Sequence, residues 1–140
     1  MTSLETLGGF VGLLGLRLAE SSEDHVVIRW PVRPQLLQAD GTVHRGVFCT
    51  VVETAASAAA SSWLDGAGRA VPVSMQTDFV ADAREGELTA TARPIHRGRS
   101  QQLWTVEITD AAARLIVRGQ VRLQNLPPAG SSPTAGAAPR

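Results

Sequence analysis

Three polar side chains recur at every fourth position of a largely apolar stretch, with Thr50, Thr54 and Ser61 beside them. Cys49, Glu53 and Ser57 would lie along one side of a helix, because residues four apart lie one above another. Glu53 is the only charged residue between Arg45 and Asp65. A carboxylate enclosed in such surroundings ionises less readily and can act as a base near neutral pH. Glu53 is therefore a candidate catalytic residue, and the alternative is an ordinary solvated or interface glutamate.

The segment 41–46 (Gly-Thr-Val-His-Arg-Gly) leads directly into this expected helix. The first turn of a helix has free backbone N–H groups and carries the positive end of the helix dipole. Such groups suit a carbonyl oxygen that becomes negative during a reaction. The simpler alternative is that Gly46 only permits a tight entry into the helix and that His44 is a satisfied loop residue.

A basic cluster joins two of the expected strands. It consists of His96, Arg97, Gly98, Arg99 and Ser100. Guanidinium groups and a hydroxyl around a glycine suit the binding of phosphate groups. The alternative is a solvated turn.

Cysteine and metal chemistry are not expected. Cys49 is the single cysteine, so no internal disulfide can form, and with no histidine near it on the helix we interpret it as a packed small residue. The three histidines, His25, His44 and His96, do not have the spacing of metal ligands.

Hydrophobic periodicity predicts the elements that must position these residues. Apolar and small residues recur at steps of one, three and four from Gly46 to Trp63, which predicts one well-buried helix. Alternation with a period of two predicts strands over residues 13–18, 26–32, 71–81, 88–95, 103–109 and 115–123. Because four consecutive strands follow the helix, the sheet should be largely antiparallel, with the helix on one face. The expected fold class is α+β.

Composition predicts one intracellular domain. With 140 residues, the chain has room for one ordinary domain, and its 13 basic and 13 acidic side chains leave no net charge to attract nucleic acid or an anionic membrane. A single cysteine fits a reducing cytoplasm. The apolar stretch 7–18 lacks a basic start and is interrupted at Arg17, so we expect neither export nor a membrane span. Residues 127–140 lack large apolar side chains, which predicts a disordered tail after a domain formed by residues 1–126.

The segment from Gln38 to Ser57 resembles the hot-dog acyl-CoA thioesterases of the phenylacetate-pathway type, including the 4-hydroxybenzoyl-CoA and dihydroxynaphthoyl-CoA thioesterases. Those proteins have a Gly, then His-Gly-Gly, then an acid nine residues after the His; here His44 and Glu53 are 53 − 44 = nine residues apart. The resemblance covers roughly residues 10 to 125. It implies a hot-dog fold, in which an antiparallel sheet wraps round one central helix.

The same resemblance implies roles for individual residues. Glu53 corresponds to the catalytic carboxylate, which acts as a nucleophile or as a general base for water. Gln38 corresponds to a glutamine near the thioester carbonyl, and Ser57 to a hydroxyl residue one turn beyond the acid. His44 corresponds to the His of the motif.

The chain departs from the family at the start of the helix. Arg45 stands where the family usually has the first Gly of Gly-Gly, so a long cationic side chain replaces a residue that is free to adopt a positive φ. The backbone N–H groups of Arg45 and Gly46 are retained, and the resemblance implies that they polarise the thioester carbonyl.

The resemblance also implies a role for the basic cluster. Arg97, Gly98, Arg99 and Ser100 would contact the phosphates of coenzyme A.

The function expected from these residues is hydrolysis of an aromatic or medium-chain acyl-CoA. Coenzyme A is then part of the substrate, and no separate cofactor is expected. We expect Phe48, Met75 and Phe79 to bound the acyl pocket, and a homodimer or homotetramer to cover the exposed edge of the sheet. One alternative is a non-catalytic hot-dog protein that binds acyl-CoA or an acyl carrier. A dehydratase of the same fold is another.

Overall fold

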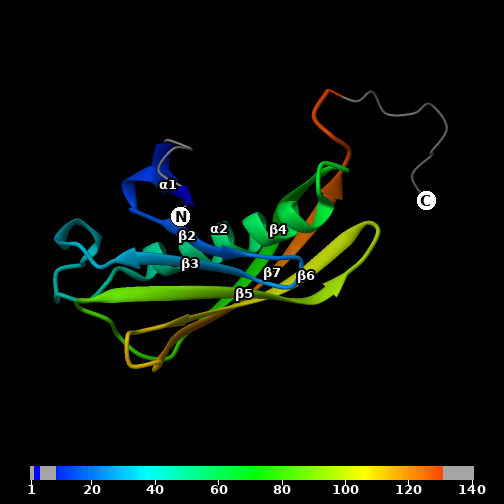
Figure 1. The fold of residues 1–140 in the computed structure, drawn as a ribbon. Helices are drawn as coiled ribbons and strands as arrows, with labels where there is room; N and C mark the ends of the chain where they lie inside the picture. Colours follow the sequence, from blue (N-terminus) through cyan, green and yellow to red (C-terminus); the bar gives the residue numbers. More distant parts are fainter. Residues whose placement is uncertain (1, 4–8, 131–140) are drawn as a thin grey trace.

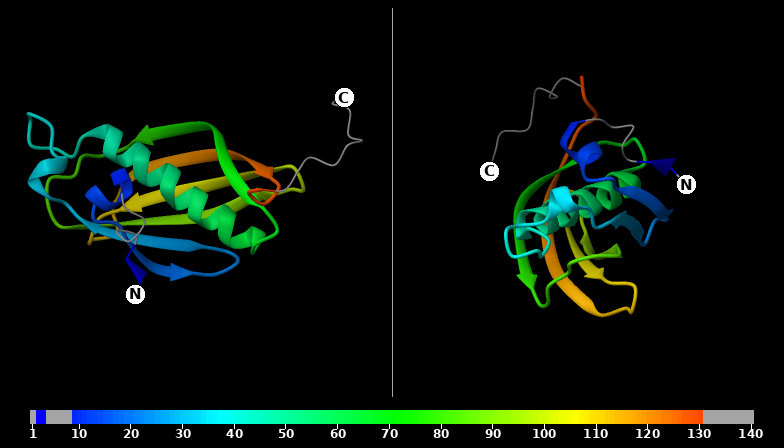
Figure 2. Two further views of the ribbon diagram at one scale, coloured as in Figure 1. Left: turned by 90° about the horizontal axis from the view of Figure 1, so that it is seen from above. Right: turned by 90° about the vertical axis from the view of Figure 1, so that its left-hand side faces the viewer.

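A curved antiparallel sheet surrounds one long helix in the computed structural model, which describes residues 2–3 and 9–130. The helix, α2 (Arg45–Leu64), crosses the inner face of the sheet, as Figure 1 and the two views of Figure 2 show. Two short helices precede it, α1 (Gly9–Leu13) and the 3-10 helix η2 (Pro34–Leu36). In their order across the sheet, the strands are β1 (Thr2–Ser3), β2 (Arg17–Ser21), β3 (Val26–Pro31), β5 (Glu87–Arg97), β6 (Gln101–Thr109), β7 (Leu115–Leu126) and β4 (Arg69–Phe79). The expected α+β class is confirmed.

Helix α2 is buried against the sheet, although its composition would also suit a membrane span. The helix is long and apolar enough to cross a bilayer by length and composition alone. Its apolar side is instead buried against the strands, and each buried Val or Phe contributes about 1.5–3 kcal/mol. The buried residues are Phe48, Val51, Val52, Ala55, Ala56, Ala59 and Ala60. We therefore assign α2 as the core helix of the domain.

Small residues let α2 approach the sheet closely. A methyl group added at Gly119 of β7 would collide with the side chain of Val52. At its C-terminal end the helix stops at Asp65, which has a left-handed φ of 46°, followed by Gly66 with a φ of 82°. This left-handed ending satisfies the last carbonyl groups of the helix. The predicted close wrapping of sheet round helix thus depends on Gly119 as well as on the alanines.

Strand β4 lies at the edge of the sheet. Among the described strands it pairs with β7 alone, and Met75 stands opposite the buried Val121, so Met75 points to the same face as α2. Nevertheless, Met75 and Phe79 remain 41% and 39% exposed. An edge strand with exposed apolar residues is a surface suited to a second chain.

The N-terminal part differs from the sequence prediction. We expected a strand over residues 13–18, but α1 occupies residues up to Leu13, Gly15 turns the chain with a φ of 69°, and β2 begins at Arg17. Leu14 and Leu16 are buried on either side of this turn. Their alternation therefore reflects burial around a turn, because a run this short cannot distinguish the two structures.

The other predicted elements are close to their observed ranges. Strands β4, β5 and β6 begin one or two residues before the predicted starts, and β7 begins at the predicted residue 115 but ends three residues later than predicted. Strand β3 and helix α2 agree with the prediction within one or two residues at each end. Most of the predicted tail, residues 131–140, lies outside the described residues, and the division at residue 126 remains a prediction.

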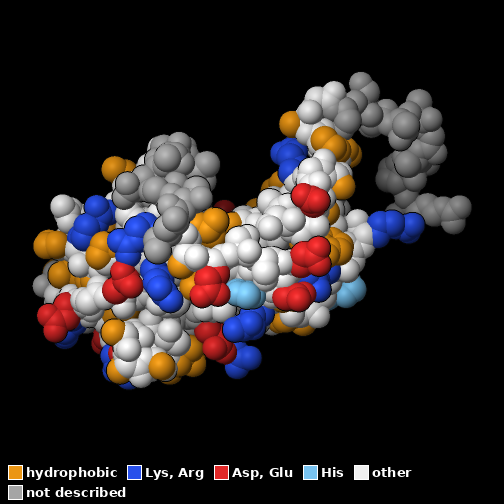
Figure 3. Space-filling view, in the orientation of Figure 1, with side chains coloured by type: hydrophobic (Ala, Val, Ile, Leu, Met, Phe, Trp, Pro, Cys, Tyr) orange, Lys and Arg blue, Asp and Glu red, His pale blue; other side chains and the backbone are white. Residues whose placement is uncertain are grey.

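The surface carries mixed charge. On the face drawn in Figure 3, arginines lie beside aspartates and glutamates, in keeping with the zero net charge of the chain. Among the described residues, Arg17 pairs with Glu87 and Arg97 with Asp24, and the His25 imidazole contacts the Glu20 carboxylate. That face has no broad basic region of the kind that binds nucleic acid.

Candidate functional site

A short hairpin precedes α2 and brings Gln38 towards the start of the helix. Leu37 pairs with Val43, and the Gln38 N–H donates to the Thr42 carbonyl at 2.8 Å. The Gln38 side-chain amide donates to the Thr42 hydroxyl at 2.8 Å. Gln38 is therefore held on the arm of the hairpin that faces the chain entering α2.

Asp40 and Arg84 fasten the tip of this hairpin. The Asp40 carboxylate accepts hydrogen bonds from the Thr42 hydroxyl at 2.6 Å and from the Thr42 N–H at 2.9 Å. These bonds favour the ionised form and lower the pKa of Asp40 below its ordinary value. The Arg84 guanidinium donates to the Asp40 carbonyl oxygen at 2.9 Å. The loop is thus fixed from both sides.

His44 is the N-cap of α2. Its Nδ1 atom accepts a hydrogen bond from the Gly46 N–H at 2.9 Å, and its carbonyl accepts one from the Val47 N–H at 2.9 Å. Among the described residues, the N–H of Arg45 makes no hydrogen bond. Of the two amides expected to polarise a carbonyl, the one at Arg45 is free and the one at Gly46 is occupied by the cap.

The Arg45 side chain is held to one side by neighbouring elements. Its guanidinium lies 3.6 Å from an Asp82 carboxylate oxygen and 5.8 Å from the centre of the Phe79 ring. Arg45 also has an ordinary helical conformation and does not adopt a positive φ. The replacement of glycine at this position is therefore compatible with the helix start.

Glu53 lies two turns further along α2. Its side chain is exposed in the single chain, and among the described residues its carboxylate has no hydrogen-bond or ion-pair partner. The hydroxyls of Thr50 and Thr54 turn back to helix carbonyls, at 2.9 and 2.7 Å. Glu53 therefore projects into solvent, free to react with a ligand.

The Arg45 N–H and the Glu53 carboxylate, the two groups best suited to catalysis, are too far apart to act together within one chain. The Arg45 N–H and Glu53 are eight residues apart, which corresponds to about 12 Å along the helix axis. A glutamate side chain cannot bridge that distance to reach a carbonyl bound at the Arg45 N–H. Cys49 lies midway between them and Ser57 one turn beyond Glu53, both half-buried.

The turn that carries residues 96–100 lies beside the other end of α2. The Arg97 guanidinium is 5.7 Å from the centre of the Trp63 ring and donates to the Glu23 carbonyl at 2.6 Å. Arg99 and Ser100 are exposed. Trp63 is 18 residues from Arg45, or about 27 Å along the axis. Arg97 is therefore occupied in a structural contact, while the contact of Arg99 and Ser100 with phosphate remains a prediction.

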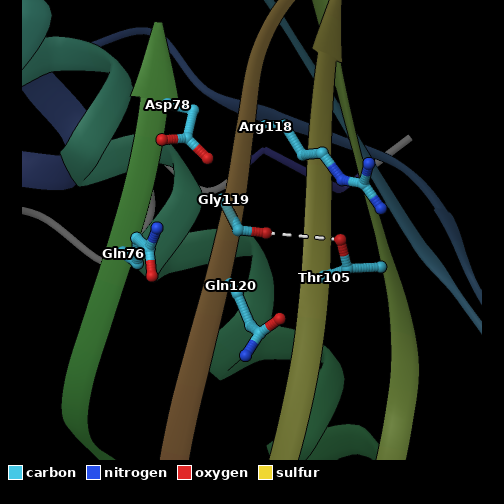
Figure 4. Close-up of a pocket in the computed structure, with 6 residues that line it drawn as sticks. All are labelled: Gln76, Asp78, Thr105, Arg118, Gly119 and Gln120. Atoms are coloured by element: carbon cyan, nitrogen blue, oxygen red, sulfur yellow. Dashed lines mark hydrogen bonds between the residues drawn. The ribbon is translucent and has the colours of Figure 1, made fainter.

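A separate cavity on the outer face of the sheet has a polar lining (Figure 4). It has a volume of about 250 Å³ and lies over β4, β7 and β6. Asp78 and Arg118 are cross-strand partners there, but the Arg118 side chain extends away from Asp78, across β6. This cavity is separated from Glu53 by the thickness of the sheet. In the described part of the chain, no cluster of three His, Cys, Asp or Glu residues could hold a metal ion.

Comparison with known proteins identifies the family. Residues 40–117 match the thioesterase superfamily. The chain belongs to this superfamily. It is 49% identical over 116 residues to the Mycobacterium tuberculosis protein Rv1847 (81% of this chain, 83% of that protein). It is also 30% identical to the 1,4-dihydroxy-2-naphthoyl-CoA hydrolase of Escherichia coli, over 77% of this chain and 79% of that protein.

Solved structures extend the similarity to the fold. The AziG structure from S. sahachiroi has a TM-score of 0.84 and 53% identity, covering 86% of this chain and 98% of that one. The thioesterase HI1161 of Haemophilus influenzae has a TM-score of 0.84 and 28% identity, covering 89% and 88%. The hot-dog fold expected from the sequence is confirmed. The chain is a thioester hydrolase of this superfamily.

Some residues around the candidate site could not be found from the sequence. Asp82 lies beside the Arg45 guanidinium, yet it is 37 positions further along the chain and belongs to no motif. Phe79 was expected only as an acyl-pocket residue, and its contact with the Arg45 guanidinium was not foreseen. Thr42, whose hydroxyl accepts a hydrogen bond from the Gln38 side chain, lies within the segment that resembles the family. Its hydroxyl could have indicated a role in positioning Gln38. The expected acyl-pocket residue Phe48 is instead buried in the core.

Proposed function

We propose that this thioesterase hydrolyses an acyl-CoA ester at a site shared by two copies of the chain. The observation that carries the proposal is the position of two free groups on one helix: the Arg45 N–H and the exposed Glu53 carboxylate, about 12 Å apart. A second copy whose α2 runs antiparallel would bring its Glu53 beside the first copy's Arg45 N–H. The relative named as a dihydroxynaphthoyl-CoA hydrolase supports a coenzyme A ester as substrate.

Simple arithmetic locates the symmetry axis of such a dimer. In two antiparallel copies of a helix, residue numbers that face each other have a constant sum; pairing Arg45 with Glu53 gives 45 + 53 = 98. The residue that faces itself is then number 49, the single cysteine. A two-fold dimer is the commonest oligomer of soluble proteins. Cys49 should therefore lie close to the axis.

The free edge at β4 supports this dimer. Antiparallel pairing of β4 with its copy would continue the sheet and hydrogen-bond the unpaired backbone groups of the edge. The same pairing would place the exposed side chains of Met75 and Phe79 near the second helix, because they lie on the face that carries α2. We propose a homodimer as the smallest active unit and a homotetramer, a dimer of dimers, as the complete protein.

The proposed reaction uses few groups. The thioester carbonyl oxygen accepts a hydrogen bond from the Arg45 N–H, which stabilises the negative charge that develops there. The facing Glu53 either removes a proton from water, which attacks the carbonyl carbon, or attacks that carbon itself to give an anhydride that water then opens. Either route breaks the carbon–sulfur bond and releases the carboxylic acid and the thiol. Gln38 and Ser57 orient the reacting groups.

The geometry also suggests which turn meets the phosphates of coenzyme A. In the antiparallel dimer, the turn that contains Arg99 and Ser100 of the copy that supplies Glu53 would lie about 15 Å beyond the reacting carbonyl, measured along α2. The corresponding turn of the copy that supplies Arg45 would be about 27 Å away on the opposite side. We propose that the nearer turn contacts the phosphates, with Arg99 as the cation.

A coenzyme A ester as substrate also favours a cytoplasmic location.

The test is thiol release from a panel of aromatic and aliphatic acyl-CoA esters. Replacing Glu53 by Gln should lower kcat by about 10²–10⁴-fold, because the amide can neither accept a proton nor attack the carbonyl. The matched control is Glu107→Gln, which removes a carboxylate from the exposed outer face of the sheet and should retain full activity. No turnover of any ester by the wild type, together with acyl-CoA binding, would contradict the proposal and favour a non-catalytic binding protein.

A further inference from the structure

An apolar groove begins at the first turn of α2, on the side that faces α1 and η2. It has a volume of about 410 Å³. Most of its lining is aliphatic or aromatic, and two polar side chains complete it. The lining includes Phe10, Leu13, Leu36, Val47, Arg33 and Gln35.

One wall of the groove belongs to the helical turn whose first amide would hold the thioester carbonyl. Val47 belongs to the same helical turn as Arg45. The Leu36 carbonyl accepts a hydrogen bond from the His44 N–H at 2.9 Å, so the groove wall is bonded to the residue before Arg45. An acyl group whose carbonyl lies at the Arg45 N–H would therefore have the groove within reach.

Arg33 is the unusual member of this lining. Its Nη2 atom donates to the Leu13 carbonyl, and its guanidinium packs over Gly15. Its Nε atom is buried and has no hydrogen-bond partner among the described residues. No carboxylate of the described part of the chain forms an ion pair with it. A cation with so few acceptors beside an apolar groove favours a ligand that brings one.

We propose that this groove binds the acyl group of the substrate and that Arg33 selects acyl groups carrying an oxygen acceptor on an otherwise apolar body. The inference rests on the proposed thioesterase function and names its substrate class. The volume suits about a dozen non-hydrogen atoms, if each occupies roughly the 30 Å³ of a water molecule. A bicyclic aromatic or medium-length acyl group fits that size. The selecting oxygen is a hydroxyl, carbonyl or carboxylate near the Arg33 guanidinium.

The test compares two esters of nearly equal length, octanoyl-CoA and its ω-carboxy counterpart. The wild type should prefer the ω-carboxy ester by about tenfold or more in kcat/KM, the effect of one charge-assisted hydrogen bond. Arg33→Met keeps the apolar length but removes every donor, and should bring the ratio close to one. The matched control is Arg93→Met, which removes an exposed arginine elsewhere on the same domain and should leave the ratio unchanged. Arg33→Lys keeps the charge but lacks the planar guanidinium. It replaces Arg33→Met in the comparison if Arg33→Met does not fold, and it should lower the preference for the ω-carboxy ester.

Binding separates this inference from the proposed function. The thioether analogues of the two esters cannot be hydrolysed, and their dissociation constants can be measured by calorimetry with wild type and with each variant. A preference for the ω-carboxy analogue that disappears in Arg33→Met, without turnover of either ester, would support the groove and contradict the thioesterase proposal. Turnover of both esters with no wild-type preference, or with a preference that Arg33→Met retains, would overturn the role of Arg33 while leaving the thioesterase proposal intact.

Discussion

The two ends of α2 differ in how their polar groups are satisfied. At the N-terminal half, the Arg45 N–H and the Glu53 carboxylate have no partner among the described residues. Beside the C-terminal end, the fully buried Gln102 donates to the Asn125 side-chain oxygen at 2.8 Å and accepts from the Trp104 indole N–H, also at 2.8 Å. Free groups suit ligand binding, whereas a satisfied network fixes a structure.

The satisfied network extends to the turn that carries the basic cluster. The Asn125 side-chain amide donates to the Gly98 carbonyl at 2.9 Å and to the Arg99 carbonyl at 3.2 Å. Its backbone N–H donates to the Ser100 carbonyl at 2.9 Å. Arg97 lies over Trp63 and is withdrawn from solvent in part. This end of the helix therefore holds a loop in position, and the other end presents reactive groups.

At the N-terminal end of α2, the largest effect should come from removing one backbone hydrogen. Arg45→Pro deletes the free N–H and should lower kcat by about 10²–10³-fold, the effect of losing an oxyanion donor. The fold should tolerate it, because proline suits the first helical position and His44 has the extended ψ of 132° that precedes proline. Thiol release and a thermal melt would be measured together.

The control for that change is Arg45→Ala, which keeps the N–H and removes the guanidinium that contacts Asp82 and Phe79. We expect Arg45→Ala to retain most of the activity. Equal activity of the proline and alanine variants would show that the Arg45 N–H takes no part in the reaction. The two ends of α2 would then not differ in function as described.

A second prediction concerns stability at the other end of the helix. Gln102→Leu leaves the buried Trp104 indole N–H and the half-buried Asn125 side-chain oxygen without their partner, and should lower the free energy of unfolding by about 2 kcal/mol. The activity of the folded fraction should change little. Urea denaturation gives the stability, and Gln120→Leu, an exposed glutamine on the same sheet, serves as the control. A loss as small as that of Gln120→Leu would show that the network is not stabilising.

The third prediction separates the cap from the catalytic groups. His44→Ala removes the acceptor of the Gly46 N–H and should cost about 1 kcal/mol of stability. His44→Asn restores a good N-cap and should recover most of that loss. If activity falls far more than stability in both variants, His44 acts on the substrate and not only on the helix start.

The sequence predicted the helix and the strands after it because their periodicities are long. Residues 46–63 and the four later strands each provide many repeats of one period, so a single exception does not change the assignment. Residues 13–18 provide only a few repeats, and burial of Leu14 and Leu16 round the Gly15 turn resembled a strand. The edge position of β4 follows from the sheet order, which periodicity does not contain.

The candidate site was predictable in its local part. Gln38, His44, Arg45 and Glu53 lie within 16 residues, 38 to 53, and were found together by spacing and resemblance. Arg33 was missed because an arginine beside a proline carries no local signal, and its significance arises from contacts with α1. Contacts between distant segments depend on the whole fold, so they appear only in the structure.

The central claim is that one site uses the Arg45 N–H of one copy and Glu53 of another, and mixing two inactive variants tests it directly. Glu53→Gln and Arg45→Pro homodimers should each be inactive. After random reassembly of equal amounts, half of the dimers are mixed and each has one intact site, so activity should return to about a quarter of the wild type. Reassembled mixtures that stay as inactive as the separate variants, although mixed dimers form, would contradict the shared site.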